Sequence, residues 1–141
     1  MKRLVVDASI IVKWLQPQRD GEENVALALE LLFAHKRDEV VILQPLHWLA
    51  EVAAVLARIS PDTVQDDMVD LQALQLSIAD TPAIWQIACE LAITLNHHLF
   101  DTLYHAVALC TPETRLVTAD RRYYEKAASK GGIVLLSDLR I

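Results

Sequence analysis

Four acidic side chains, Asp7, Glu51, Asp101 and Asp120, are the residues of this sequence whose types and positions suggest chemistry. They lie far apart along the chain, and each adjoins a run of apolar residues that is expected to be buried. If the fold brings them together, the four carboxylates repel one another, and one or two hard divalent cations with oxygen ligands relieve that repulsion best. The four acids are therefore candidate ligands for Mg²⁺ or Mn²⁺.

Two of the acids follow predicted strands. Asp7 comes directly after the short aliphatic run 3–6, and Asp120 comes shortly after the run 115–118. Ligands of open α/β sheets bind in the crevice beyond the carboxyl ends of the strands, so we expect both carboxylates at one edge of the sheet. The alternative for each is an ordinary turn or N-cap residue.

The other two acids belong to predicted helices. Glu51 interrupts the helical run 48–56, which is otherwise apolar, and a buried, unpaired carboxylate costs several kcal/mol there. Glu51 must therefore meet solvent, a cation or a proton partner. Asp101 precedes the predicted helix 102–110, where the helix dipole favours a negative charge. The alternatives are a plain N-cap for Asp101 and a surface position for Glu51.

The elements that position these residues alternate between short apolar runs and longer segments with helical spacing. Strands are predicted at 3–6, 40–43, 115–118 and 133–136, with a weaker candidate at 77–80. Helices are predicted at 23–36, 47–59, 61–76, 82–95, 102–110 and 121–129, two of them with Ser60 and Thr81 as N-caps before a proline. The alternation predicts an α/β fold, a three-layer α/β/α single domain over 1–141 with a mainly parallel central sheet of four or five strands.

The composition bears on partners and location. Of the 141 residues 53% are hydrophobic and the mean hydropathy is +0.25, which predicts that another chain covers part of the surface, most simply in a homodimer. The formal net charge of −6 argues against a broad basic surface for nucleic acid, although bound metal ions supply positive charge where a phosphate meets the protein. Because no apolar run is long enough for a membrane span, we expect a cytoplasmic protein.

Four segments, in order along the chain, resemble those of PIN domains. The segment 5–9 (VVDAS) is similar to their opening strand with its first acid, and 47–56 to their glutamate-bearing helix. The segments 100–108 (FDTLYHAVA) and 116–121 (LVTADR) resemble the aspartate-led helix and the strand with the final acid. Together they cover nearly the whole chain, whose size most resembles the toxin ribonucleases of VapBC toxin-antitoxin pairs.

The resemblance implies a PIN-like fold and a Mg²⁺- or Mn²⁺-dependent endoribonuclease that cleaves RNA phosphodiester bonds. It implies that the four acids bind metal and act in catalysis, with Ser9 and Thr118 as hydroxyl-bearing neighbours, and it leaves open whether one or two ions bind. As the toxin of a type II pair, the chain would have an antitoxin protein as its partner. Arg121 and Arg122, which follow the last acid, are candidate contacts for RNA phosphates, with a solvated surface as the alternative.

Other functions remain as alternatives with less support. A catalytically inactive PIN-like module that binds RNA or a protein partner is the main one, weakened because all four acids are present. A metal-free nuclease based on His97, His98 or His105 lacks a second paired acid-base group. An aspartate-based phosphatase or phosphotransfer domain needs a second acid beside Asp7 or two residues after it, where this chain has alanine and serine.

Overall fold

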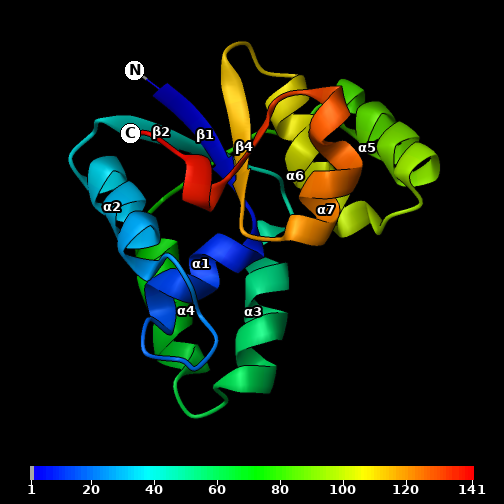
Figure 1. Cartoon of the computed structure of the whole chain (residues 1–141). Helices are drawn as coiled ribbons and strands as arrows, with labels where there is room; N and C mark the ends of the chain where they lie inside the picture. Colours follow the sequence, from blue (N-terminus) through cyan, green and yellow to red (C-terminus); the bar gives the residue numbers. More distant parts are fainter. Residues whose placement is uncertain (1) are drawn as a thin grey trace.

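Residues 2–141, which the computed structural model describes, alternate between strands and helices (Figure 1). The strands are β1 (Lys2–Val6), β2 (Val40–Gln44), β3 (Ser77–Ile78), β4 (Thr114–Thr118) and β5 (Ile133–Leu135). The helices are α1 (Ala8–Leu15), α2 (Val25–Lys36), α3 (Trp48–Ile59), α4 (Val64–Ala73), α5 (Pro82–Leu95), α6 (Leu99–Leu109) and α7 (Arg121–Ala127). Two short 3₁₀ helices, η1 (Ala128–Lys130) and η2 (Leu136–Asp138), flank β5.

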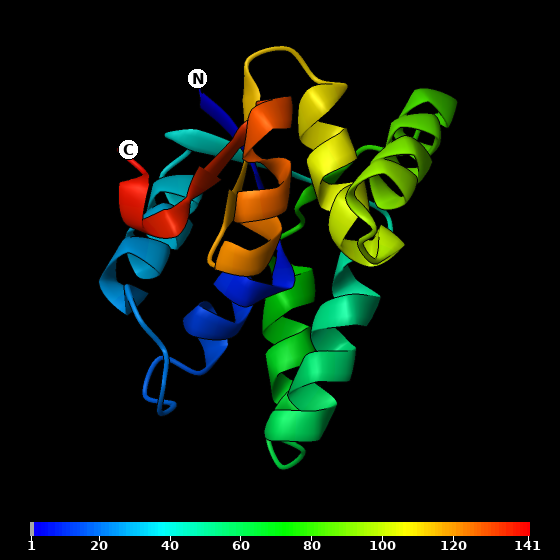
Figure 2. The same cartoon turned by 45° about the vertical axis from the view of Figure 1, so that its right-hand side comes forward.

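The five strands form one parallel sheet in the order β3-β2-β1-β4-β5. Along the chain, β1, β2 and β3 are added one after another toward one edge of the sheet. The chain then crosses to the other side of β1, where β4 and β5 are added toward the opposite edge. Since such crossovers are right-handed, α1–α4 lie on one side of the sheet and α5–α7 on the opposite side, as Figures 1 and 2 show. The predicted three-layer α/β/α fold is confirmed, and all strand pairs are parallel.

The central strand β1 lies at the middle of the hydrophobic core. Its residues Leu4, Val5 and Val6 are fully buried, because helices cover the sheet on both faces. One cluster of buried apolar side chains extends from β1 into the helices of both layers. Burial on two faces explains why β1, β2 and β4 each contain consecutive apolar residues with no polar residue between them.

Helix α1 has no counterpart among the predicted helices. Six of its eight residues are buried, because it packs against β1, α2 and α3. The helix has only eight residues and begins directly after β1, so in the sequence its apolar residues continue those of the strand, and a run this short does not identify a helix. Its start is nevertheless encoded, since the Asp7 side chain caps it by accepting a hydrogen bond from the Ser9 amide at 3.1 Å.

Two predicted helix starts are wrong, and both errors have a local cause. Ser60 ends α3 instead of capping the next helix, because residues 60–63 form the turn that lets α4 run back along α3. Helix α6 begins at Leu99 and not at Thr102, since the imidazole of His98 accepts a hydrogen bond from the Phe100 amide at 3.0 Å. Asp101 therefore lies within the first turn of α6.

The other predicted elements agree with the structure within a few residues. Thr81 is the N-cap of α5, with proline in the first helical turn, as predicted. The weak candidate at 77–80 is the two-residue strand β3. Helices α3 and α4 lie side by side and extend past the carboxyl ends of the strands (Figures 1 and 2). Within residues 2–141 no helix combines the length and apolar character needed to cross a bilayer.

On the side of β2, a side chain replaces the strand ladder at the carboxyl end of β1, whereas on the side of β4 the ladder continues to Val6. The β1–β2 pairing ends at Leu4 and Ile42, and beyond it the fully buried Gln44 side chain bonds the backbone of Val6. The Val6 amide donates to Oε1 at 2.9 Å, and Nε2 donates to the Val6 carbonyl at 2.8 Å. Gln44 thereby satisfies two buried backbone groups immediately before Asp7.

We predict that Gln44→Leu destabilises the protein by about 2–4 kcal/mol, because it leaves two buried backbone groups at Val6 without partners. Urea unfolding of the variant measures this loss. Gln86→Leu, an exposed position on α5, is the matched control and should change the free energy of unfolding by less than about 0.5 kcal/mol. Equal stabilities of the two variants would contradict the role of Gln44.

Candidate metal site

The four predicted acids meet beyond the carboxyl ends of β1 and β4. Asp7 follows β1, Asp120 follows β4, Asp101 lies in the first turn of α6, and Glu51 lies in the first turn of α3. The charges of Asp101 and Asp120 act on Asp7, and those of Glu51 and Asp120 act on Asp101. The fold therefore brings together carboxylates from four separate parts of the chain.

Asp7 lies in a network of hydroxyl groups. The Ser9 hydroxyl donates to one carboxylate oxygen of Asp7 and the Thr118 hydroxyl to the other. Each hydroxyl also accepts a backbone hydrogen bond at 3.0 Å, Ser9 from Ala119 and Thr118 from Asp120. Each hydroxyl therefore accepts from an amide and donates its own proton to a carboxylate oxygen of Asp7. The network joins the end of β1 to the turn after β4.

The environment of Asp7 opposes its negative charge. The pKa of this carboxyl is raised to about 7, mainly by burial; the hydrogen bonds from Ser9 and Thr118 oppose the rise, and the charges of Asp101 and Asp120 add to it. The pKa of Asp101 is also raised, first by burial, with Glu51 and Asp120 adding to the effect and His97 opposing it. A site in which acids resist ionisation is suited to a group of opposite charge.

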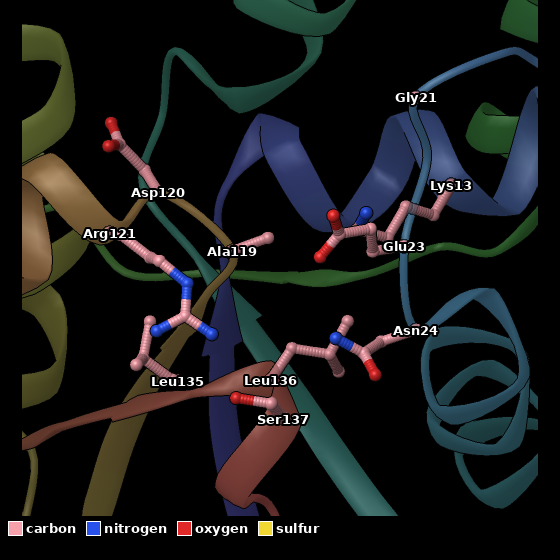
Figure 3. Close-up of a pocket in the computed structure, with 10 residues that line it drawn as sticks. All are labelled: Lys13, Gly21, Glu23, Asn24, Ala119, Asp120, Arg121, Leu135, Leu136 and Ser137. Carbon is pink, nitrogen blue, oxygen red and sulfur yellow. The ribbon is translucent and has the colours of Figure 1, made fainter.

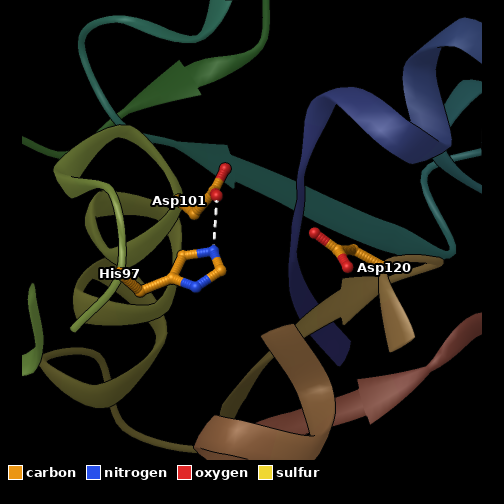
Figure 4. A group of neighbouring side chains, drawn as sticks. All are labelled: His97, Asp101 and Asp120. Carbon is orange, nitrogen blue, oxygen red and sulfur yellow. Dashed lines mark hydrogen bonds and ion pairs between the residues drawn. The ribbon is translucent and has the colours of Figure 1, made fainter. Parts of the chain in front are cut away.

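His97, Asp101 and Asp120 form the tightest group of polar atoms in the site. One ligand atom from each lies within 4.8 Å of the other two, which is a spacing that a metal ion could bridge. His97 Nε2 lies 2.8 Å from Asp101 Oδ2. Figure 4 shows the Asp120 carboxylate, from the turn after β4, facing His97 and Asp101 at the start of α6. Asp7 and Glu51 lie outside this group of three.

Glu51 faces a cluster of aromatic rings. Its carboxylate lies 3.7 Å from His47 Nε2, which donates to the Phe100 carbonyl at 2.9 Å. The buried hydroxyl of Tyr104 lies next to Glu51 but forms no hydrogen bond of ordinary geometry with it. Burial, followed by the charges of Glu51 and Asp7, raises the pKa of Tyr104 far above its usual range, so this hydroxyl can only act as a neutral donor or acceptor.

A hollow of about 400 Å³ lies on the side of α1, and Asp120 is the one of the four acids that lines it (Figure 3). Lys13 and Arg121 line it together with Asp120, and the Arg121 guanidinium projects into it, while the Asp120 carboxylate points away. Lys13 is buried and forms a 2.8 Å ion pair with Glu22. Arg122 does not line this hollow, so the structure separates the two candidate RNA contacts.

Three residues of the site were not assigned from the sequence. The sequence suggests His97 only for a metal-free reaction, and it suggests no role for Tyr104 or Gln44. The spacing of His97 and Asp101, four residues apart, would have indicated a pair, but the predicted helix began after both. Tyr104 and Gln44 carry no such signal, because aromatic and amide side chains inside apolar runs are usually parts of the core.

Comparison with known proteins adds to the geometry. The model of the PIN domain family matches residues 4–129. The crystal structure of PAE2754 from Pyrobaculum aerophilum has a TM-score of 0.63 and 18% identity, over 96% of this chain and 90% of that one. The structure of VapBC2 from Rickettsia felis bound to a DNA fragment from their promoter has a TM-score of 0.64 and 18% identity, over 94% of this chain and 96% of that one.

Sequence identities this low show similarity of fold. No curated protein matches the sequence closely enough to count as a relative. The family model, in contrast, covers most of the chain and includes all four acids. Because the family model spans far more than half of the chain, the chain belongs to the PIN domain family.

Proposed function

We propose that the chain is a metal-dependent endoribonuclease, a hydrolase that cleaves RNA phosphodiester bonds. The observation that supports this most directly is the meeting of Asp7, Glu51, Asp101 and Asp120 at one end of the sheet, with the pKa of two of them raised. Membership of the PIN domain family supports nuclease activity. No other function of this family is favoured by a particular feature of the site.

The donor set of the site fits one or two divalent cations. Its acids offer carboxylate oxygens, which hard ions such as Mg²⁺ and Mn²⁺ prefer. Asp7, Asp101 and Asp120 would hold the ion directly, and Glu51 would act directly or through a water molecule. When bound, such a cation lowers the pKa of a coordinated water molecule and stabilises negative charge on the phosphate.

The protein's own residues have distinct tasks in this proposal. Ser9 and Thr118 fix the Asp7 carboxylate between β1 and β4. Glu51, which comes from the opposite side on α3, orients the attacking water and accepts its proton. Arg121, in the hollow beside Asp120, binds an RNA phosphate next to the one that is cleaved.

We further propose that this nuclease is the toxin of a type II toxin-antitoxin pair and acts in the cytoplasm. Its fold is similar to that of VapBC2 from Rickettsia felis, which supports this assignment. The apolar composition favours burial of part of its surface, against an antitoxin protein and in a homodimer.

We predict that Mn²⁺ raises the melting temperature, because the ion binds only the folded state. A metal concentration about 100-fold above Kd stabilises by about 2.7 kcal/mol. Asp120→Asn should abolish most of this shift. It should also lower the rate of RNA cleavage by more than the roughly 10–100-fold that is typical when a residue hydrogen-bonded to a metal ligand is lost. Asparagine can still cap α7, so the variant is expected to fold.

Asp62→Asn, in the exposed turn between α3 and α4, serves as the control and should keep both the melting shift and the cleavage activity. A melting temperature that does not respond to Mn²⁺ in the unaltered protein would argue for an inactive module that binds RNA or a protein partner.

We predict that the metal-free protein becomes less stable as pH rises from about 4 to about 7. The pKa of Asp7 rises from 3.8 to about 7 on folding, so the folded state binds more protons than the unfolded state within this interval. Stability contributed by the protonated carboxyl is present at the acidic end and lost by about pH 7. Asp7→Asn should remove this part of the pH dependence, measured by urea unfolding in the presence of a chelator.

The same proton must leave when a cation binds Asp7, so the affinity for Mn²⁺ is expected to fall as pH decreases below about 7. If Asp7→Asn and the unaltered protein show identical pH profiles of unfolding, the raised pKa does not belong to Asp7.

We predict that Arg121→Gln raises KM for RNA more than Arg122→Gln does, because only Arg121 lines the hollow beside Asp120. Loss of one phosphate contact should also reduce the slope of log KM against log salt concentration by about 0.7 to 1. Steady-state cleavage at several salt concentrations measures both effects. Equal changes in the two variants would place the RNA elsewhere.

A further inference from the structure

His97 lies between a lysine and an acid of the proposed metal site. Its Nε2 atom is 2.8 Å from Asp101 Oδ2, and its Nδ1 atom is 3.2 Å from Lys126 Nζ on α7. Lys126 also donates to the Asn96 carbonyl at 3.1 Å, which fixes the position of its ammonium group. The His97 ring packs edge-on against Tyr123, with centroids 4.8 Å apart. Both ring nitrogens thus have defined partners.

The chemistry of these partners determines where the imidazole proton lies. A lysine ammonium group has three donors and no acceptor, so it must donate to Nδ1. A nitrogen that accepts this bond carries no proton, and the proton of the neutral ring is therefore on Nε2. From there it is donated to Asp101, an acceptor. Lys126, which can only donate, and Asp101, which accepts, thus determine the direction of both hydrogen bonds of the His97 ring.

This arrangement conflicts with metal binding by His97, although its distances to Asp101 and Asp120 would allow it. To bind a cation, Nε2 would need a free lone pair, and the ring proton would move to Nδ1. There it would point at the ammonium group of Lys126. The tautomer that binds metal is the one that Lys126 disfavours.

We infer that Lys126 holds His97 in the Nε2–H tautomer, so that His97 positions the Asp101 carboxylate and is not itself a metal ligand. The part of this inference that concerns the metal rests on the proposed function, whereas the tautomer does not. With Asp101 Oδ2 bonded to the imidazole, Oδ1 stays available for a cation. His97 is thus a positioning residue, and Lys126 acts through it.

The consequence is a site that offers only oxygen atoms. Oxygen ligands suit Mg²⁺ and Mn²⁺, whereas an added imidazole nitrogen would favour Co²⁺, Ni²⁺ and Zn²⁺. Lys126, which touches none of the four acids by hydrogen bond, would in this way set the choice of metal. Removing the charge of Lys126 should allow Nε2 of His97 to bind the metal ion.

The tautomer can be measured without metal. In long-range ¹H–¹⁵N spectra of the chelated protein, His97 should show a protonated Nε2 and an unprotonated Nδ1, with its signals assigned by their loss in His97→Phe. Lys126→Met leaves Asp101 as the partner that favours Nε2–H, so the share of the Nδ1–H tautomer should rise above that of the unaltered protein. Lys126→Arg should resemble the unaltered protein, because guanidinium also has only donors. A proton on Nδ1 of His97 in the unaltered protein would overturn the inference, whatever the variants do.

Pulsed electron paramagnetic resonance of the Mn²⁺-loaded protein tests the second part. We expect no directly bound ¹⁴N in the unaltered protein or in Lys126→Arg, and a bound ¹⁴N in Lys126→Met. The affinity of Lys126→Met for Co²⁺ relative to Mn²⁺ should increase by at least about tenfold, the equivalent of about 1.4 kcal/mol. Lys130→Met, an exposed position in η1, is the matched control and should change neither result.

The two ideas fail in different ways. Nitrogen bound to Mn²⁺ in the unaltered protein would reject the positioning role of His97 and leave the proposed nuclease intact. A protein that binds no Mn²⁺ at all would reject the proposed function, and the tautomer spectra would still decide whether Lys126 orients His97.

Discussion

The parallel pairing of β1 with β4 is the constraint on which the site depends. Parallel strands end at the same edge, so Asp7 and the turn carrying Asp120 meet there although they are far apart in the sequence. The hydrogen bond from Thr118 to Asp7, which spans 111 positions of the chain, closes this junction. Helices α3 and α6 then add Glu51 and Asp101 from opposite layers. A different strand order would separate the acids even if every helix were kept.

The burial and mutual repulsion of the four acids are unfavourable, and hydrogen bonds to Asp7 and Asp101 offset this cost only in part. Burial and mutual repulsion raise the pKa of Asp7 and Asp101, while hydroxyl donors and His97 oppose the rise. Such a concentration of like charge is unfavourable for the fold alone, and it is typical of places where function outweighs stability. Gln44, Ser9 and Thr118 form hydrogen bonds with the polar groups around the site. The unfavourable electrostatics are therefore limited to the carboxylates.

The sequence was informative wherever a residue's position had one simple physical reason. Asp7 and Asp120 could be placed because acids after apolar strands of an α/β fold have few other locations, and Glu51 because an apolar helix has no polar face for it. Helix α1 was missed because it is short and follows β1 directly, so that its apolar residues continue those of the strand. The start of α6 was missed because a histidine ring caps it. The pairing of His97 with Asp101 was therefore not predicted either. Contacts such as that of Gln44 with Val6 depend on tertiary geometry and leave no pattern in the sequence.

The sheet also limits how copies of the chain can associate. Both outermost strands are very short, with two residues in β3 and three in β5. Long exposed edge strands can pair with strands of other molecules. Edge strands as short as β3 and β5 offer few free backbone groups for such pairing. Contacts between two copies are therefore expected to use the surfaces of helices, and a continuous sheet across an interface is disfavoured by the lengths of these two strands.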